Sequence, residues 1–153
     1  MRWLPCVLLF VLQSANAETL SGKVVSVIDG DTLTLADAAK KRHRVRLAGI
    51  DAPEAKQPFG VQSARALAQL CHGKAAKVEW KEKEGRIHLG QVTCDDKDAG
   101  VEQVRRGMAW VSPKQTTPGS ALYELEAVGR LRKVGLWADD NPVPPWEWRS
   151  GKR

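Results

Sequence analysis

Two short segments of the sequence carry the residue types that bind phosphate groups and hard metal cations. The first is Asp29-Gly30-Asp31, between two runs rich in β-branched residues, and the second is VRLAGIDAPE at residues 45–54, with Arg46, Asp51 and Glu54. An arginine can donate two parallel hydrogen bonds to a phosphate, and carboxylate oxygens are ligands that hard divalent cations prefer. Taken singly, each residue is equally typical of an ordinary turn or of a solvent-facing strand position.

The two segments can form one site only if the fold of the first third of the chain places them close together. Residues 22–35 contain two strand-like runs separated by a strong hairpin signal, residues 36–41 form a second turn, and residues 42–50 predict a third strand. In an antiparallel meander, the turn after the first strand and the end of the third strand lie at the same edge of the sheet. We therefore expect the aspartates of the two segments to share one rim.

Clustered carboxylates repel one another unless a cation lies between them. Asp31 and Asp51 offer oxygen donors with no soft ligand nearby, which favours Ca²⁺, Mg²⁺ or Mn²⁺ over Zn²⁺. Arg46, together with Arg86 from the polar segment 81–86, could stabilise charge that builds up on a phosphate, and Glu54 could activate a water molecule. The alternative for each arginine is simple surface solubility.

The remaining sequence predicts further strands and helices of a small barrel. The predicted elements, in order, are a helix over 61–71, strands over 74–80 and 87–94 joined by a loop at 81–86, helices over 99–107 and 121–135, and an irregular tail rich in proline and tryptophan at 142–153. Five short strands with an inserted helix favour an α+β fold, a five-stranded Greek-key barrel of the OB type with three helices.

The first seventeen residues resemble a secretory signal peptide. A positive start at Met1-Arg2 precedes a short apolar run, and Ala15-Asn16-Ala17 has the small residues of a cleavage site. This predicts an exported protein, periplasmic or secreted, whose mature domain is 18–153. No other segment is long and apolar enough to suggest a membrane span.

The charge of the chain is compatible with a polyanionic partner. Lys and Arg number 24 against 18 Asp and Glu, a net charge of +6; loss of Arg2 with the signal peptide leaves 23 − 18 = +5. A basic exported protein could bind nucleic acid, an acidic polysaccharide or anionic lipid, although at this charge solubility alone is an equally good explanation. Nothing in the sequence requires more than a monomer.

Two cysteines remain after removal of the signal peptide, Cys71 and Cys94. Export to an oxidising compartment and the even count favour one disulfide between them, with two buried thiols as the alternative.

The sequence resembles the staphylococcal nuclease (thermonuclease) family over about residues 20–148. The similarity rests on seven pieces, which are VIDGDTLTL at 27–35, RLAGIDAPE at 46–54, QPFG at 57–60, GR at 85–86, VRRGMAWV at 104–111, GLWA at 135–138 and PPWEWR at 144–149. The separation between the first two pieces makes the resemblance specific.

The resemblance implies Ca²⁺-dependent cleavage of DNA and RNA phosphodiester bonds to 3′-phosphate products. It implies that Asp31 and Asp51 hold the Ca²⁺ ion with help from the backbone carbonyl of Ala52. The family often has threonine at that last position, and alanine should serve as well because the main chain provides the ligand.

The resemblance also implies roles around the substrate. Arg46 and Arg86 would bind the scissile phosphate, Glu54 would act as base or orient the attacking water, and Lys83 is expected to bind substrate. In-line attack would expel the 5′-oxygen.

Four positions depart from the family pattern. Glu84 stands where the family has tyrosine, Ser112 and Gln115 lie where base-stacking tyrosines are usual, and Gly100 stands where asparagine is common. Loss of a stacking aromatic costs about 1–3 kcal/mol of nucleotide binding. The alternative function is therefore a nucleic-acid-binding module of the same fold with weak or no turnover.

A third interpretation concerns the tail. Trp146 and Trp148 could dock on a partner protein in the cell envelope, whereas the simpler interpretation is that the tail packs over the barrel or the last helix.

Overall fold

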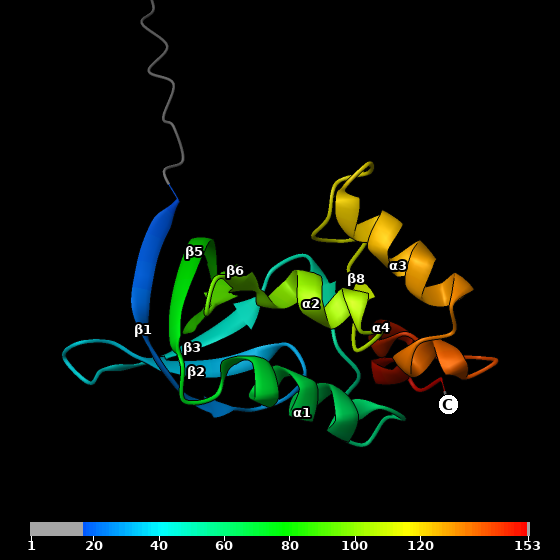
Figure 1. Cartoon of the computed structure of the whole chain (residues 1–153), viewed down its shortest axis with the longest axis horizontal. Helices are drawn as coiled ribbons and strands as arrows, with labels where there is room; N and C mark the ends of the chain where they lie inside the picture. Colours follow the sequence, from blue (N-terminus) through cyan, green and yellow to red (C-terminus); the bar gives the residue numbers. More distant parts are fainter. Residues whose placement is uncertain (1–16, 153) are drawn as a thin grey trace, which may run out of the picture.

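Five strands close into a barrel in the computed structural model, which describes residues 17–152 (Figure 1). These strands are β1 (Glu18–Val27), β2 (Thr32–Ala36), β3 (Arg42–Leu47), β5 (Ala75–Glu84) and β6 (Ile87–Cys94). They pair in the order β3-β2-β1-β5-β6, and a parallel pairing of β3 with β6 closes the barrel. The prediction of an α+β fold built on a five-stranded OB-type barrel is confirmed.

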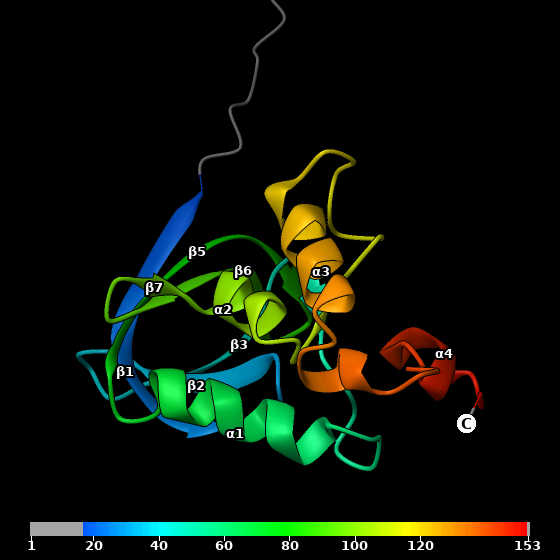
Figure 2. The same cartoon turned by 45° about the vertical axis from the view of Figure 1, so that its right-hand side comes forward.

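Short strands and helices complete the fold. They are β4 (Ile50–Asp51), α1 (Gly60–Cys71), β7 (Lys97–Asp98), α2 (Ala99–Arg105), β8 (Trp110–Val111), α3 (Ala121–Leu131), the 3-10 helix η1 (Gly135–Ala138) and α4 (Pro145–Arg149). Helices α3 and α4 lie on the side of the molecule opposite β1, as Figures 1 and 2 both show. None of the helices within residues 17–152 is long and apolar enough to cross a membrane. Residues 1–16 of the predicted signal peptide lie outside the described part of the chain.

The barrel interior is filled by aliphatic side chains from alternate strand positions, as expected for strands with one buried face. The fully buried aliphatic residues of the five barrel strands are Val24, Leu33, Leu35, Val45, Leu47, Val78 and Val92. Leu67 and Leu70 of α1 belong to the same cluster, so this helix covers the core.

The structure corrects three element boundaries. The predicted loop at 81–86 is largely strand, because β5 continues through Glu84 and pairs with β6 down to Ile87, and only Gly85 and Arg86 turn. Both faces of this end of the hairpin are exposed, so the sequence shows no alternation of hydrophobic and polar residues that would have predicted a strand.

The predicted third strand stops at Leu47, where a turn containing Gly49 at φ 79° redirects the chain into β4. The predicted helix over 121–135 ends at Leu131.

The tail over 142–153 was expected to be irregular, but it contains helix α4. Pro145 at the first helical position suits a helix start, because its fixed φ is helical and its missing N–H would have no partner there. Trp146 packs against a small cluster of Trp110, Leu136 and Trp137. The tail is therefore packed on the body of the protein, as the simpler interpretation had it, and the prediction of three helices becomes four.

Cys71 and Cys94 form a disulfide that joins the end of α1 to the end of β6, with 5.3 Å between their Cα atoms. The bridge closes a loop with a sequence separation of 23 residues. Restricting the unfolded chain in this way stabilises the folded state by about 3 kcal/mol on the chain-entropy model.

Removal of this bridge gives the first testable expectation. The double variant Cys71→Ala/Cys94→Ala should lose about 3 kcal/mol of unfolding free energy, measured by urea unfolding of residues 18–153. Wild-type protein unfolded in reductant is the control and should show a similar loss. Equal urea midpoints for oxidised and reduced wild type would contradict the expectation.

Candidate active site

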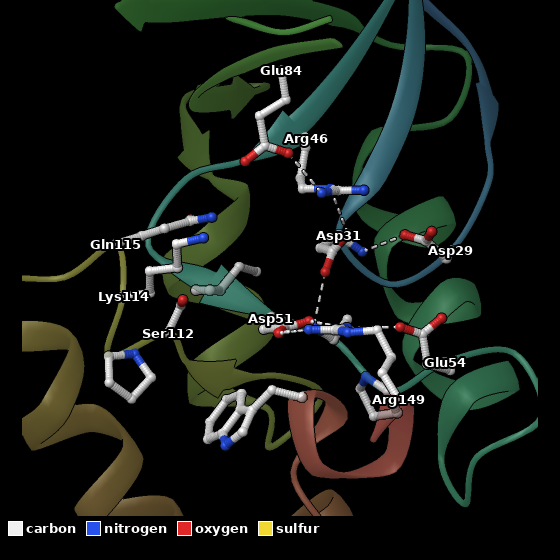
Figure 3. A pocket seen from close by; sticks show the side chains of 15 residues that line it. Asp29, Asp31, Arg46, Asp51, Glu54, Glu84, Ser112, Lys114, Gln115 and Arg149 are labelled. Carbon is white, nitrogen blue, oxygen red and sulfur yellow. Dashed lines mark hydrogen bonds and ion pairs between the residues drawn. The ribbon is translucent and has the colours of Figure 1, made fainter. Parts of the chain in front are cut away.

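A pocket of about 540 Å³ opens at the rim of the barrel, between the β1–β2 turn, the end of β3 and helix α4 (Figure 3). Its charged lining residues are the five acids Asp29, Asp31, Asp51, Glu54 and Glu84 and the three bases Arg46, Lys114 and Arg149. The excess of acidic groups favours the entry of a cation.

Asp31 joins the two segments that the sequence analysis singled out. Its backbone carbonyl accepts a hydrogen bond from the N–H of Leu47 at 2.8 Å, and its carboxylate accepts one from the N–H of Ala52, also at 2.8 Å. The first turn is thereby tied to the end of β3 and to β4. The structure brings Asp31, Asp51 and Glu54 to one rim, as expected for an antiparallel meander.

Close packing beneath the β1–β2 turn holds this arrangement. The backbone carbonyl of Gly30 accepts a hydrogen bond at 2.7 Å from the side-chain amide of Gln103, which is fully buried in α2. A Cβ atom on Gly30 would lie 1.8 Å from the hydroxyl oxygen of Ser63. A larger residue at position 30 would therefore push the turn, and Asp31 with it, away from the helices.

The carboxyl group of Asp31 is buried, and burial is unfavourable for its charged form. Its residue is 7% exposed, and burial, with a further contribution from nearby Asp29, raises the pKa of Asp31 to about 7. The hydrogen bonds from Ala52 and Thr32 act in the opposite direction and are weaker influences. A buried carboxylate of this kind gains more from a bound cation than an exposed one, because water does not already solvate it.

Glu54 projects into the same pocket from a backbone that is fixed on several sides. Its N–H donates to the side-chain oxygen of Gln57, and its carbonyl accepts from the N–H of Gln57 at 2.8 Å. A Cβ atom on Gly60 would approach that carbonyl to 2.0 Å, so α1 begins directly beneath it only because residue 60 is glycine. The role of Gln57 was not predicted, although the residue belongs to the QPFG segment.

Arg46 lies on β3 opposite Thr32, which places it beside Asp31. Its Nη1 atom donates to Oε2 of Glu84 at 3.0 Å, and its Nε atom lies 3.9 Å from Oδ1 of Asp31. The unusual acid at position 84 therefore neutralises the arginine that the sequence analysis assigned to phosphate.

Arg149 is a pocket residue that the sequence analysis did not assign. It extends from α4 to Asp51 and Glu54, with Nη2 at 2.6 Å from Oδ2 of Asp51 and Nη1 at 2.7 Å from Oε1 of Glu54 (Figure 3). The hydrogen bonds with Asp51 raise the pKa of Arg149 further above its usual value. The only signal in the sequence was its position in the PPWEWR segment.

Arg86 and Lys83 lie away from this pocket. Arg86 is exposed at the β5–β6 turn and lines a neighbouring hollow that also contains Lys41, Arg42 and Lys83. The ammonium of Lys83 lies 4.6 Å from the centre of the Trp80 ring. The structure does not bring either residue to the carboxylates, and their predicted contacts with substrate stay predictions.

The unusual residues at 112–115 have contacts at the rim. The N–H of Ser112 donates to the carbonyl of Gly49, and the side-chain oxygen of Gln115 accepts from the N–H of Gly49 at 3.0 Å. These residues line the pocket but supply no aromatic ring to it. Gly100 lies in a different depression, lined also by Ala48 and Thr116.

The donor groups of the pocket fit a hard cation in an open site. Asp31, Asp51 and Ala52 offer carboxylate and carbonyl oxygens, and within residues 17–152 no cluster of three or more His, Cys, Asp or Glu residues forms a ready-made cage. An incomplete set of protein ligands leaves positions for water and substrate oxygens. The guanidinium on Asp51 and Glu54 shows that a positive group is favourable at this place.

Comparison with known proteins agrees with this geometry. A family model described as staphylococcal nuclease homologue matches residues 44–139. The chain is 40% identical over 155 residues to an uncharacterized endonuclease of Escherichia coli, with 99% of both chains covered. It is 36% identical over 144 residues to an uncharacterized endonuclease of Haemophilus influenzae, covering 94% of this chain and 80% of the relative. It is 36% identical over 144 residues to a micrococcal nuclease of Shigella flexneri, covering 86% of this chain and 82% of that protein.

The family match spans more than half of the chain, and the similarity to these relatives extends over nearly all of it. A rim that gathers Arg46, Asp51 and Glu54 on an OB-type barrel agrees with both findings. The chain therefore belongs to the staphylococcal nuclease family.

Proposed function

We propose that this protein is an exported, Ca²⁺-dependent endonuclease that hydrolyses phosphodiester bonds of DNA or RNA and leaves 3′-phosphate products. The observation that best supports this proposal is that a single pocket is lined by Asp31, Asp51, Glu54 and Arg46. The names of the relatives, endonuclease and micrococcal nuclease, support the same reaction. The disulfide is in keeping with an oxidising compartment outside the cytoplasm.

The proposed chemistry divides between the bound ion and the side chains of the pocket. Ca²⁺, when bound, polarises a phosphoryl oxygen, and Asp31, Asp51 and the carbonyl of Ala52 are the groups that would hold it. Glu54 accepts the proton of the attacking water, and Arg46 donates hydrogen bonds to the phosphate as negative charge grows on its oxygens. The 5′-oxygen leaves on the side opposite the water.

Charge balance explains why a cation should be required. Five acids and three bases line the pocket, so it carries an excess of negative charge even before a phosphodiester enters. A divalent cation held by these residues would reduce this repulsion, would stabilise Asp31 in its charged form, and would leave both arginines available to the substrate.

A second function, nucleic-acid binding with little turnover, is favoured by one observation. Glu84 pairs with Arg46 at 3.0 Å and so competes with a substrate phosphate for the same guanidinium. Weak turnover would follow if this pair persisted in the complex.

The first test measures cleavage of single-stranded DNA by the oxidised mature protein, with Ca²⁺ or with a chelator. Glu54→Gln and Arg46→Ala should each lower kcat at least about 100-fold, because general-base catalysis and charge stabilisation typically contribute that much. Arg44→Ala is a matched control, since Arg44 lies two residues earlier on β3, is exposed and does not line the pocket. Wild-type protein that binds DNA without cleaving it would instead support the binding module.

A second test addresses Glu84. Glu84→Gln should lower the KM for single-stranded DNA several-fold at low ionic strength, because Arg46 loses a competing anion. The gain should shrink as salt is added, whereas Glu82→Gln, on the same strand and outside the pocket, should change KM little. An unchanged KM for the Glu84 variant at every salt concentration would show that this pair does not restrict the substrate.

A third test uses the pKa of Asp31. Folding raises this pKa from 3.8 to about 7, so the folded protein holds a proton that the unfolded chain releases between these values. This contribution to stability is present below pH 3.8 and is lost as the pH rises through about 7, in the absence of a cation. At about 1.4 kcal/mol per pKa unit, a shift of this size corresponds to a loss of at most about 4 kcal/mol.

The variant Asp31→Asn, which carries no titrating group, isolates this effect. In chelator, its unfolding free energy relative to wild type should increase as the pH is raised from about 4 to 8, and added Ca²⁺ should stabilise wild type but not the variant. Asp140→Asn, an exposed site, serves as control. A difference between Asp31→Asn and wild type that does not change with pH would contradict the assignment.

A further inference from the structure

Helix α4 places a guanidinium on two acids that the proposed reaction uses. Arg149 contacts both carboxylate oxygens of Asp51, at 3.2 and 2.6 Å, and one oxygen of Glu54 at 2.7 Å. These contacts join residues 98 and 95 positions apart in the sequence. Figure 3 shows the side chain lying between the two acids at the mouth of the pocket.

Helix α4 is held in place by several contacts besides those of this arginine. Pro145 is buried, Trp146 packs on the cluster of Trp110, Leu136 and Trp137, and the side-chain amide of Gln57 donates to the carbonyl of Val143. The side chains of Arg149 and Glu54 are 49% and 42% exposed, and an ion pair between such exposed groups contributes little to stability. Anchoring of the tail therefore does not explain why a guanidinium lies over Asp51.

The substrate site, in contrast, needs positive charge at this place. Arg86, the expected second arginine of the phosphate site, lines a different hollow, and Arg46 is paired with Glu84. Arg149 is the second guanidinium that lines the pocket, and it is accessible to a ligand from solvent. Its planar fork binds a carboxylate and a phosphate with the same two parallel hydrogen bonds.

We propose that Arg149 is a substrate-binding residue whose guanidinium exchanges Asp51 and Glu54 for a phosphate group of the nucleic acid. In the ligand-free protein it is the counter-ion of both acids. When Asp51 coordinates a metal cation and Glu54 accepts a hydrogen bond from a water molecule, the guanidinium of Arg149 would lose both partners. It would then be repelled by the cation and attracted by the neighbouring phosphate. This inference rests on the proposed function of the pocket and adds the C-terminal helix to the substrate site.

The test measures phosphate binding without cleavage. Isothermal titration calorimetry with a nucleoside 3′,5′-bisphosphate, which has no internucleotide bond to hydrolyse, is performed in Ca²⁺ on wild type, Arg149→Gln, Arg149→Lys and Lys152→Gln. Lys152 is a matched control because it removes one charge from the same tail, pairs with Glu147 and does not line the pocket. A parallel titration with Ca²⁺ alone measures metal affinity.

We expect Arg149→Gln to weaken bisphosphate binding about tenfold or more, the loss typical of a charge-assisted hydrogen bond. Arg149→Lys should fall between this variant and wild type, because an ammonium keeps the charge but lacks the fork, and Lys152→Gln should stay within about twofold of wild type. Arg149→Gln should bind Ca²⁺ at least as tightly as wild type, since a competing cation has been removed. Thermal melting confirms that each variant is folded.

Three results would overturn the inference. Unchanged bisphosphate affinity in both Arg149 variants would show that no phosphate contact exists. Tighter bisphosphate binding in Arg149→Gln would make the residue an inhibitory latch. Joint loss of Ca²⁺ and bisphosphate binding with a lower melting temperature would make it a structural residue. A wild type that binds the bisphosphate but cleaves no nucleic acid would contradict the proposed reaction alone, so the two failures are distinguishable.

Discussion

The hydrogen bond from the N–H of Ala52 to the buried carboxylate of Asp31 is the interaction on which the site depends. It joins the β1–β2 turn to the end of β4, three strands later in the chain. The second bond, from the N–H of Leu47 to the carbonyl of Asp31, ties the same turn to the end of β3. Every proposed ligand and the proposed base follow from this junction, because Asp51 is adjacent to Ala52 and Glu54 lies two residues further along.

The same junction imposes an energetic cost. Burial favours the neutral acid and raises the pKa of Asp31, so the metal-free fold holds a carboxyl group that is unfavourable when charged. Helices α1 and α2 keep it in place regardless, through the contact of Gln103 with Gly30 and the tight packing of Gly30 against Ser63. A rigid, partly desolvated acid of this kind is suited to a cation, since the ion recovers the interaction with solvent that folding removed. Stability of the protein without a cation and the proposed affinity of Asp31 for metal are thus opposed.

Residues of the site differ in how far the sequence could predict them. Asp31, Asp51 and Glu54 were predictable because a three-stranded meander is local, and antiparallel pairing alone places its first turn and the end of its third strand at one edge. Arg149 was not, since its contact with Asp51 spans 98 positions and depends on where the packing of Trp146 sets α4. Arg86 illustrates the opposite case, in which a recognisable Gly-Arg pair lies in a hairpin turn that points to another hollow. The polar end of that hairpin has no alternation of hydrophobic and polar residues. Its strand structure comes from cross-strand hydrogen bonds between β5 and β6, which leave no pattern in the sequence.

The pairing of charges in the pocket links metal binding to substrate binding. Arg46 is held by Glu84 and Asp31, and Arg149 by Asp51 and Glu54, so both guanidiniums are engaged by acids of the pocket itself. A cation bound as proposed to Asp31 and Asp51 would weaken one partner of each arginine at the same time. The two arginines would then gain affinity for phosphate together, and by thermodynamic reciprocity a bound phosphate would strengthen cation binding by the same factor. If the proposed cation binds there, the ion pairs of the pocket would make nucleic-acid binding conditional on metal without any movement of a domain.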